Sequence, residues 1–292
     1  MVLGMALVTA VDTTAKHLGA SLSPLQVVWG YYLGIVMPFL AWPLVRGVPL
    51  REAFRSRRPG LQMVRAMLLV FSLGCLFTAL RYLPLAEATA ISFAAPLFVT
   101  GLSAPVLGEK VGPHRWAAVV CGLVGVFVII RPGLAAVHWA AVLPLISALS
   151  FALYQLLTRV LSQTDDLLPT LLFTGLGGAL LTTPAAAFVW STPSAGQWLT
   201  MILMGFGGAG AHVCIVRAFS LSPASLLAPF NYTRLLWAIL LGFVVFGDLP
   251  DGFTLAGGAL IAGSGIYVAM RERRLGRVAV SAAAAGGPAV RP

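Results

Sequence analysis

The chain has 292 residues, of which 59% are hydrophobic and 10% are charged, and its formal net charge is +10. Because about a quarter of the residues of a soluble protein are charged, this composition leaves too little polar surface for a water-soluble fold and indicates a membrane protein. A positive charge of this size in a soluble protein would suggest nucleic acid, but here the arginines cluster beside apolar segments, so we expect no nucleic-acid partner.

Ten apolar segments follow one another along the chain, and most approach the roughly 20 residues that a helix needs to span a bilayer. Several begin with helix-start signals: a capping box at Ser23–Gln26, and Pro84 with Glu87 in the following first turn. The sequence therefore predicts an all-α integral membrane protein. The expected spans are 2–18, 25–45, 61–81, 84–107, 115–131, 139–160, 169–190, 198–220, 223–246 and 253–270.

The distribution of lysine and arginine predicts the orientation of these spans. With the N-terminus in the cytoplasm, 15 basic residues, Arg65 among them, face the inside, and only Lys16, Arg81 and Arg131 fall toward the outside. We therefore expect a multi-pass protein of a bacterial-type inner (plasma) membrane, with both termini cytoplasmic and lipid around the helices.

Two apolar stretches 139 residues apart, 84–109 and 223–248, carry corresponding residues. The pairs at this offset are Pro84 and Pro223, Ser92 and Asn231, Phe93 and Tyr232, Gly108 and Gly247, and Glu109 and Asp248. Earlier positions also match at slightly different offsets, such as Lys16 with Arg159. Paired, proline-interrupted hydrophobic segments of this kind point to a transporter's binding site.

The correspondence predicts two five-helix repeats, residues 1–133 and 134–272, followed by a basic cytoplasmic tail, 273–292, that we expect to be disordered. Because five is odd, the second repeat must enter the membrane from the opposite side. The two repeats would then be inverted and related by a pseudo-two-fold axis in the membrane plane.

One glycine motif is misleading. Residues 205–210, GFGGAG, fit the dinucleotide-binding pattern but follow no strand and lie inside an apolar run. We interpret them, like Gly30 and Gly34, as places where helices pack closely, or where a helix unwinds beside a cavity. Phosphate-loop, zinc and nucleophile-elbow motifs are all lacking in the sequence. No enzyme activity, cofactor or metal is therefore expected.

Charged residues inside apolar spans are costly and are functional candidates by default. Asp12 and Lys16 stand four residues apart on one helix, so either they form an ion pair, or Asp12 binds a coupling proton or a substrate amine. Arg234 shares a helix face with Asn231 and Trp237. We expect it to contact a substrate, with internal pairing to Asp12 or Glu87, or snorkelling to an interface, as alternatives.

Further cavity candidates are weaker. His212 lies mid-span and fits either a core position or a cavity wall. Tyr154 and Gln155 correspond to Val11 and Asp12 by the repeat. Aromatic side chains are candidates for an apolar wall, and two prolines are expected to kink helices near the site. These residues are Phe71, Phe77, Phe93 and Tyr232 for the wall, and Pro96 and Pro229 for the kinks.

Ten helices in two repeats, each ending in a Pro-interrupted helix, a Gly-acid pair and a Gly-rich helix, resemble the EamA family of the drug/metabolite transporter superfamily. The matching text is AISFAAPLFVTGLSAPVLGEKVGPHRWAAVVCGLVGVFVIIRPG in the first repeat and PASLLAPFNYTRLLWAILLGFVVFGDLPDGFTLAGGALIAGSGIYVA in the second. The narrower resemblance is to YddG-type aromatic amino acid exporters. It implies solute export through a central cavity bounded by helices 1, 3, 4, 6, 8 and 9. The arginine that many members carry in the second helix is Tyr31 here.

These observations predict a secondary active transporter that exports small polar metabolites, amino acids above all, by alternating access, with a proton as the candidate coupling ion. Three alternatives stay open. A carrier of phosphorylated or nucleotide sugars would need convergent lysines and arginines, whereas Arg234 stands alone. A passive channel would show flux without saturation. An intramembrane enzyme would need a nucleophile, metal cluster or carboxylate pair.

Overall fold

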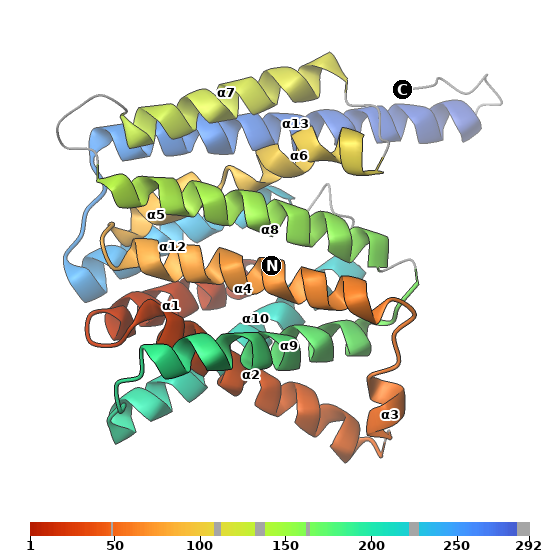
Figure 1. Cartoon of the computed structure of the whole chain (residues 1–292). Helices are drawn as coiled ribbons and strands as arrows, with labels where there is room; N and C mark the ends of the chain where they lie inside the picture. The colour runs from red at the N-terminus through yellow and green to blue at the C-terminus, as the bar shows by residue number, and fades with distance from the viewer. Residues whose placement is uncertain (48, 108–111, 132–137, 162–163, 222–227, 285–292) are drawn as a thin grey trace.

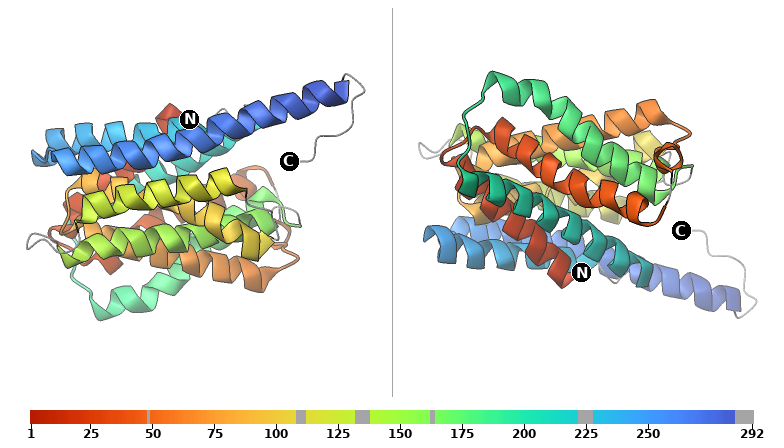
Figure 2. Two further views of the ribbon diagram at one scale, coloured as in Figure 1. Left: turned by 90° about the horizontal axis from the view of Figure 1, so that it is seen from above. Right: turned by 90° about the horizontal axis from the view of Figure 1, so that it is seen from below.

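The computed structural model describes residues 1–47, 49–107, 112–131, 138–161, 164–221 and 228–284, and within these ranges the chain is helical and contains no strand. The long helices lie side by side in one bundle (Figure 1), and α13 runs along its edge and projects beyond it (Figure 2). The all-helical prediction is confirmed for these ranges.

The elements follow one another with short connections. In the first half they are α1 Val2–Gly19, α2 Pro24–Val45, α3 Leu50–Ala53, α4 Pro59–Leu80, α5 Leu85–Ser92, α6 Ala95–Leu107 and α7 Pro113–Ile130. In the second half they are η1 Trp139–Ala141, α8 Val142–Leu161, α9 Leu167–Phe188, α10 Ala195–Leu221, η2 Ala228–Tyr232, α12 Thr233–Leu241, η3 Gly242–Phe246 and α13 Gly252–Ala284.

Six helical segments are long and apolar enough to cross a membrane, and three shorter apolar helices accompany them among the described residues. Large apolar side chains such as Phe188, which is 91% exposed, lie on the outside of the bundle. An apolar outer surface of this kind is what a surrounding bilayer would cover.

At the C-terminus, α13 is helical as far as Ala284. The end of this helix reads RVAVSAAA, and alanine has the highest intrinsic helix propensity. The disorder expected of the tail 273–292 stays a prediction. Residues 285–292 lie outside the described ranges.

Two of the expected spans are interrupted helices. The span expected over 84–107 is divided into α5 and α6 by a turn at Phe93 and Ala94. The span expected over 223–246 contains a 3₁₀ turn, η2, then α12, and ends in the π-helical turn η3. Pro96 stands at the second residue of α6 and Pro229 in η2, so an irregular backbone accompanies both prolines.

Helices from the first half pack mainly on helices from the second half. α4 packs on α8 and α9, α10 packs on α1 and α2, α6 packs on α8, and α12 packs on α1. Two further pairs, α2 with α9 and α7 with α13, complete the arrangement. The core is therefore shared between the halves of the chain and does not belong to either one.

Glycines allow the closest of these contacts. A Cβ on Gly34 of α2 would lie 2.7 Å from the Ile202 carbonyl oxygen and 2.9 Å from the Gly205 Cα of α10, so the two backbones touch. Gly208 faces the ring of Tyr31 in the same interface. The glycine motif at 205–210 therefore serves helix packing, one of the two interpretations made from the sequence.

Candidate functional site

The centre of the candidate site is an ion pair between α1 and α12. The Arg234 guanidinium donates from Nη2 to Asp12 Oδ2 at 2.6 Å, and the two side chains are only 18% and 5% exposed. Arg234 is the second residue of α12, directly after the irregular η2 segment, and Asp12 lies two-thirds of the way along α1. The internal pairing considered for Arg234 is therefore present, with Asp12 as the partner.

The predicted pair of Asp12 with Lys16 is wrong. Lys16 Nζ instead donates to Asp248 Oδ2 at 2.6 Å and to the Leu83 carbonyl oxygen at 3.1 Å, and it lies over the ring of Phe246. The sequence interpretation failed because it considered only neighbours on the same helix. Asp12 and Lys16 each pair with a residue more than 200 positions away in the sequence. Asp12 joins α1 to α12 through Arg234, and Lys16 joins α1 to Asp248, just after η3.

The two helix breaks meet beside this pair. The rings of Phe93, in the turn between α5 and α6, and Tyr232, at the end of η2, contact each other edge to face with centroids 5.2 Å apart. These two residues correspond in the predicted repeat. The structure therefore brings Phe93, Tyr232 and Arg234 together, and Asn231, partly buried in η2, directly precedes Tyr232 in the chain.

A second buried arginine, which the sequence analysis counted only as a charge facing the inside, lies on α4. Arg65 is 1% exposed, and its guanidinium donates to Thr158 Oγ1 at 3.0 Å, to the Thr170 carbonyl oxygen at 2.7 Å and to Thr174 Oγ1. It also lies over the ring of Tyr154, 4.8 Å from the centroid. The signal that singled out Arg234, an arginine within an apolar span, was present at Arg65 as well.

Tyrosines connect the two arginine-centred groups. Tyr31, buried on α2, lies near both Asp12 and Tyr154. Its ring also contacts Tyr32, with centroids 5.4 Å apart, and Phe77, with centroids 6.3 Å apart. The candidate site thus runs from Arg234 and Asp12, past Tyr31, to Tyr154 and Arg65, through five different helices.

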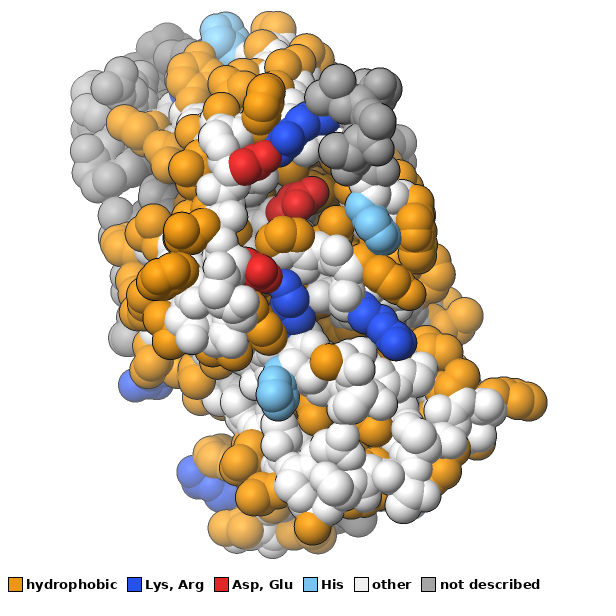
Figure 3. Space-filling model, turned by 90° about the vertical axis from the view of Figure 1, so that its left-hand side faces the viewer, with side chains coloured by type: hydrophobic (Ala, Val, Ile, Leu, Met, Phe, Trp, Pro, Cys, Tyr) orange, Lys and Arg blue, Asp and Glu red, His pale blue; other side chains and the backbone are white. Residues whose placement is uncertain are grey.

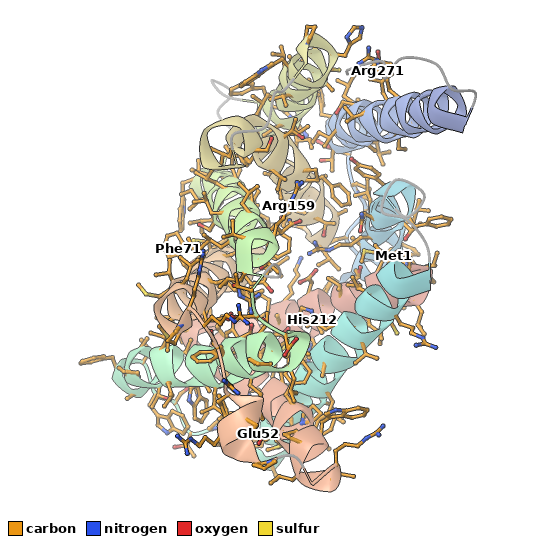
Figure 4. The ribbon with its side chains drawn as sticks, turned by 90° about the vertical axis from the view of Figure 1, so that its right-hand side faces the viewer. Met1, Glu52, Phe71, Arg159, His212 and Arg271 are labelled. Atoms are coloured by element: carbon orange, nitrogen blue, oxygen red, sulfur yellow. The ribbon has the colours of Figure 1, made fainter. Side chains whose placement is uncertain are left out.

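The remaining sequence candidates differ in position. His212 on α10 is partly buried, lies near enough to Arg65 to sense its charge, and is on the inner side of the ring of helices (Figure 4). Phe71 is 56% exposed and lies at the outer edge of the bundle in the same view, where it faces away from the site. Gln155 is exposed on α8, and Pro96 is exposed on α6.

Across the residues that the structure describes, no group of three or more His, Cys, Asp or Glu side chains is placed to hold a metal ion. Among the charged groups of the site, Asp12 and Arg234 form an ion pair, and Arg65 contacts threonine hydroxyl groups and the Tyr154 ring. Such a site can bind a solute through complementary charges and hydrogen bonds.

A comparison with protein families decides the class. The sequence profile of the EamA-like transporter family matches the chain twice, over residues 1–131 and 138–270. The chain belongs to the EamA-like transporter family. The EamA-like resemblance predicted from the sequence, within the drug/metabolite transporter superfamily, is therefore confirmed.

The EamA-like chain is similar to transporters of several solutes. It is 25% identical over 263 residues to an S-adenosylmethionine uptake transporter of Rickettsia prowazekii, a match that covers 90% of this chain and 88% of that protein. It is 31% identical to a riboflavin transporter of Vibrio cholerae, with 80% of each chain covered. It is 26% identical to the pseudopaline exporter CntI of Pseudomonas aeruginosa, with 87% of this chain and 88% of that protein covered.

The fold of the EamA-like chain also matches a solved crystal structure. The TM-score is 0.65 with 22% sequence identity, and the match covers 94% of this chain and 96% of the other. At this identity the likeness shows a shared fold. Together with the family match, it identifies the chain as a membrane transporter of small molecules.

Proposed function

We propose that this protein is a secondary active transporter of amino-acid-type metabolites, which it exports by alternating access, and that Asp12 and Arg234 are the centre of its substrate site. The observation that carries the proposal is the buried ion pair between α1 of the first half and α12 of the second. A charged pair this deep in an apolar bundle is costly, and it is retained in transporters where it marks a solute or ion pathway.

The packing of the helices supports two inverted repeats. If each helix of the first half is exchanged for its counterpart in the second, α4 on α8 becomes α10 on α1, and α6 on α8 becomes α12 on α1. The pairs α2 with α9 and α7 with α13 map onto themselves. A contact pattern that is unchanged by this exchange is what a pseudo-two-fold axis between the halves produces, and transporters with inverted repeats rock about such an axis.

The interrupted helices support a site on that axis. The α5–α6 break and the η2–α12 break fall at corresponding residues, and their aromatic side chains touch. Broken helices at membrane depth are tolerated where they line a cavity or are buried in protein, and in transporters they hold the substrate. At the predicted outer end, the Lys16–Asp248 pair ties α1 to the residues that follow η3.

The charges of the pair favour a substrate with both a carboxylate and an ammonium group. A substrate carboxylate can replace Asp12 on the Arg234 guanidinium, and a substrate ammonium group can donate to the freed Asp12 carboxylate, so the exchange leaves neither charge unpaired. An α-amino acid carries both groups. S-adenosylmethionine, the solute named for several relatives, is itself an α-amino acid, and this supports the same substrate class.

Counterflow in proteoliposomes tests the proposal. We expect radiolabelled amino acids to accumulate when the vesicles are preloaded with unlabelled substrate, and Arg234→Gln to reduce the exchange of amino acids at least tenfold. Arg46→Gln is the matched control, because Arg46 is exposed at the end of α2 and lies over the Trp42 ring. Saturable exchange separates a carrier from a channel. Absence of exchange with every amino acid and S-adenosylmethionine would refute the substrate class.

Uptake is the second candidate for the direction of transport, because several relatives over about nine-tenths of the chain are uptake transporters. Asp12 is the group we propose to carry a coupling proton. Imposing a pH gradient in either direction on the same vesicles distinguishes proton-driven export from uptake, and Asp12→Asn should abolish the response to the gradient. If the gradient has no effect on wild-type protein, proton coupling is excluded.

A further inference from the structure

A separate pocket lies at the end of the bundle that the lysine and arginine distribution places outside. Its volume is about 270 Å³, and its lining comes from the α4–α5 connection and the ends of α5, α7, η1 and α13. Figure 3 views this end of the molecule, where acidic and basic side chains gather along the middle of the face. The pocket contains neither Asp12 nor Arg234, so it is distinct from the proposed substrate site.

One wall of the pocket is a neutral ion pair. Arg131 donates from Nη2 to Asp251 Oδ2, and Asp251 also accepts the backbone N–H of Thr254 at 2.9 Å at the start of α13. The Arg131 guanidinium lies over the Phe253 ring at 4.3 Å. The Arg131 and Asp251 charges therefore neutralise each other within the protein.

The backbone at Arg131 is held in an unusual conformation. Arg131 has φ 51° and ψ 56°, and it is the one non-glycine residue of the described ranges with positive φ. A left-handed conformation at a large side chain costs on the order of 1 kcal/mol or more, and such residues gather at ligand-binding sites. Here this conformation ends α7 and places the guanidinium in the pocket wall.

Glu87 supplies a carboxylate that has no ion-pair partner among the described residues. It lies in the first turn of α5 and is half-buried in the pocket lining. Asp251 and Arg131 are near enough for their charges to act on it, yet among the described residues no hydrogen bond or ion pair reaches its carboxylate. With Arg131 and Asp251 cancelling each other, the pocket has a net charge of −1 from Glu87.

Two aromatic side chains also line the pocket. The rings of Tyr82 and His138 stack with centroids 5.3 Å apart, and the Trp139 ring, outside the lining, lies 5.2 Å from that of Tyr82. Aromatic rings beside a carboxylate form the environment that binds organic cations, because the rings attract the cation and cover its apolar part. The volume is below that of typical drug-sized pockets and suits a molecule of a few non-hydrogen atoms.

We propose that this pocket is a second binding site, specific for a small primary ammonium ion whose charged group contacts Glu87 and whose apolar part lies against Tyr82 and His138. The site is independent of transport, because it needs neither the central ion pair nor alternating access. Failure of amine binding would leave the proposed function intact, and failure of transport would leave this site intact.

Thermal denaturation of the purified full-length protein in detergent tests the site, with n-butylammonium chloride as the probe. A ligand that binds only the folded state raises Tm with concentration. We expect a saturating rise in Tm with wild-type protein that reaches half its maximum in the millimolar range. Sodium chloride at the same concentration and n-butanol should not reproduce it, because one lacks the apolar group and the other lacks the charge.

Two variants decide the assignment. Glu87→Gln should lose the amine-dependent rise in Tm, whereas Glu52→Gln, on the exposed helix α3 at the other end of the molecule, should retain it. If Glu87→Gln does not fold, Tyr82→Leu, at a side chain that is 46% exposed, should weaken half-saturation at least threefold. An unchanged response in both folded variants, or no amine-specific rise in wild type up to 100 mM, would overturn the proposal.

Discussion

Removing one member of the Asp12–Arg234 pair should cost far more stability than removing an exposed arginine. At a separation of 2.6 Å, the gross attraction at an effective dielectric constant of about 20 is about 6 kcal/mol. Much of that offsets the desolvation of the two charges, but truncating one partner leaves the other buried and unpaired, which costs about 3–5 kcal/mol. At about 2–4 °C per kcal/mol, Arg234→Gln should lower Tm by on the order of 10 °C.

A double-mutant cycle measured by fluorescence-detected thermal unfolding checks this magnitude. Asp12→Asn and Arg234→Gln should each destabilise strongly, and the double variant should be more stable than the sum of the single losses predicts, with a coupling free energy of at least about 2 kcal/mol. Arg46→Gln should stay within about 0.5 kcal/mol of wild type, as an exposed substitution does. If Arg234→Gln costs no more than Arg46→Gln, or if the single losses simply add, the reasoning about a buried pair is wrong.

Three further predictions concern the loops and helix contacts. Burial raises the pKa of Asp165, but hydrogen bonds donated by the Ser56 hydroxyl, the Gln62 amide and the Arg57 N–H outweigh it and hold that pKa below its ordinary value. The stabilisation is therefore complete above about pH 4 and is lost as pH falls through the lowered pKa, so Asp165→Asn should flatten the dependence of Tm on pH at acid pH. Asp248→Asn should destabilise by about 1 kcal/mol, because the carboxylate is one-third exposed, and Lys16→Met in the same background should add little. Gly205→Ala should cost about 1–3 kcal/mol by overpacking against the α2 backbone, whereas Gly74→Ala, where a Cβ meets nothing within 4 Å, should be neutral or stabilising in the same thermal assay.

The order of the helices could be predicted from the sequence because each apolar segment carries its own length and start signals. The helix breaks near Pro96 and Pro229 could be predicted for the same local reason. The family also followed from paired local patterns. The length of each apolar segment and its start signals are set by the bilayer for each segment separately, so they can be predicted without knowing how the helices pack.

The ion pairs could not be predicted in this way. Lys16 has an acid four residues before it, yet it binds Asp248, because the ends of α1 and η3 meet only after the two halves pack. Arg65 was counted only among the basic residues that indicate orientation, although it lies six residues inside α4. Its partners on α8 and α9 are the Thr158 and Thr174 hydroxyl groups and the Thr170 carbonyl oxygen, and such neutral acceptors carry no signal in a search for opposite charges.

The crossing of α2 and α10 has a mechanical consequence. At Gly34 and Gly205 main-chain atoms meet with no side chain between them, and each helix belongs to a different half of the transporter. Because only backbone atoms meet at this contact, no side-chain rotamer has to change when the angle between α2 and α10 changes. In the proposed alternating-access cycle, this crossing would be the pivot about which one half tilts on the other, and added bulk there would prevent the tilt.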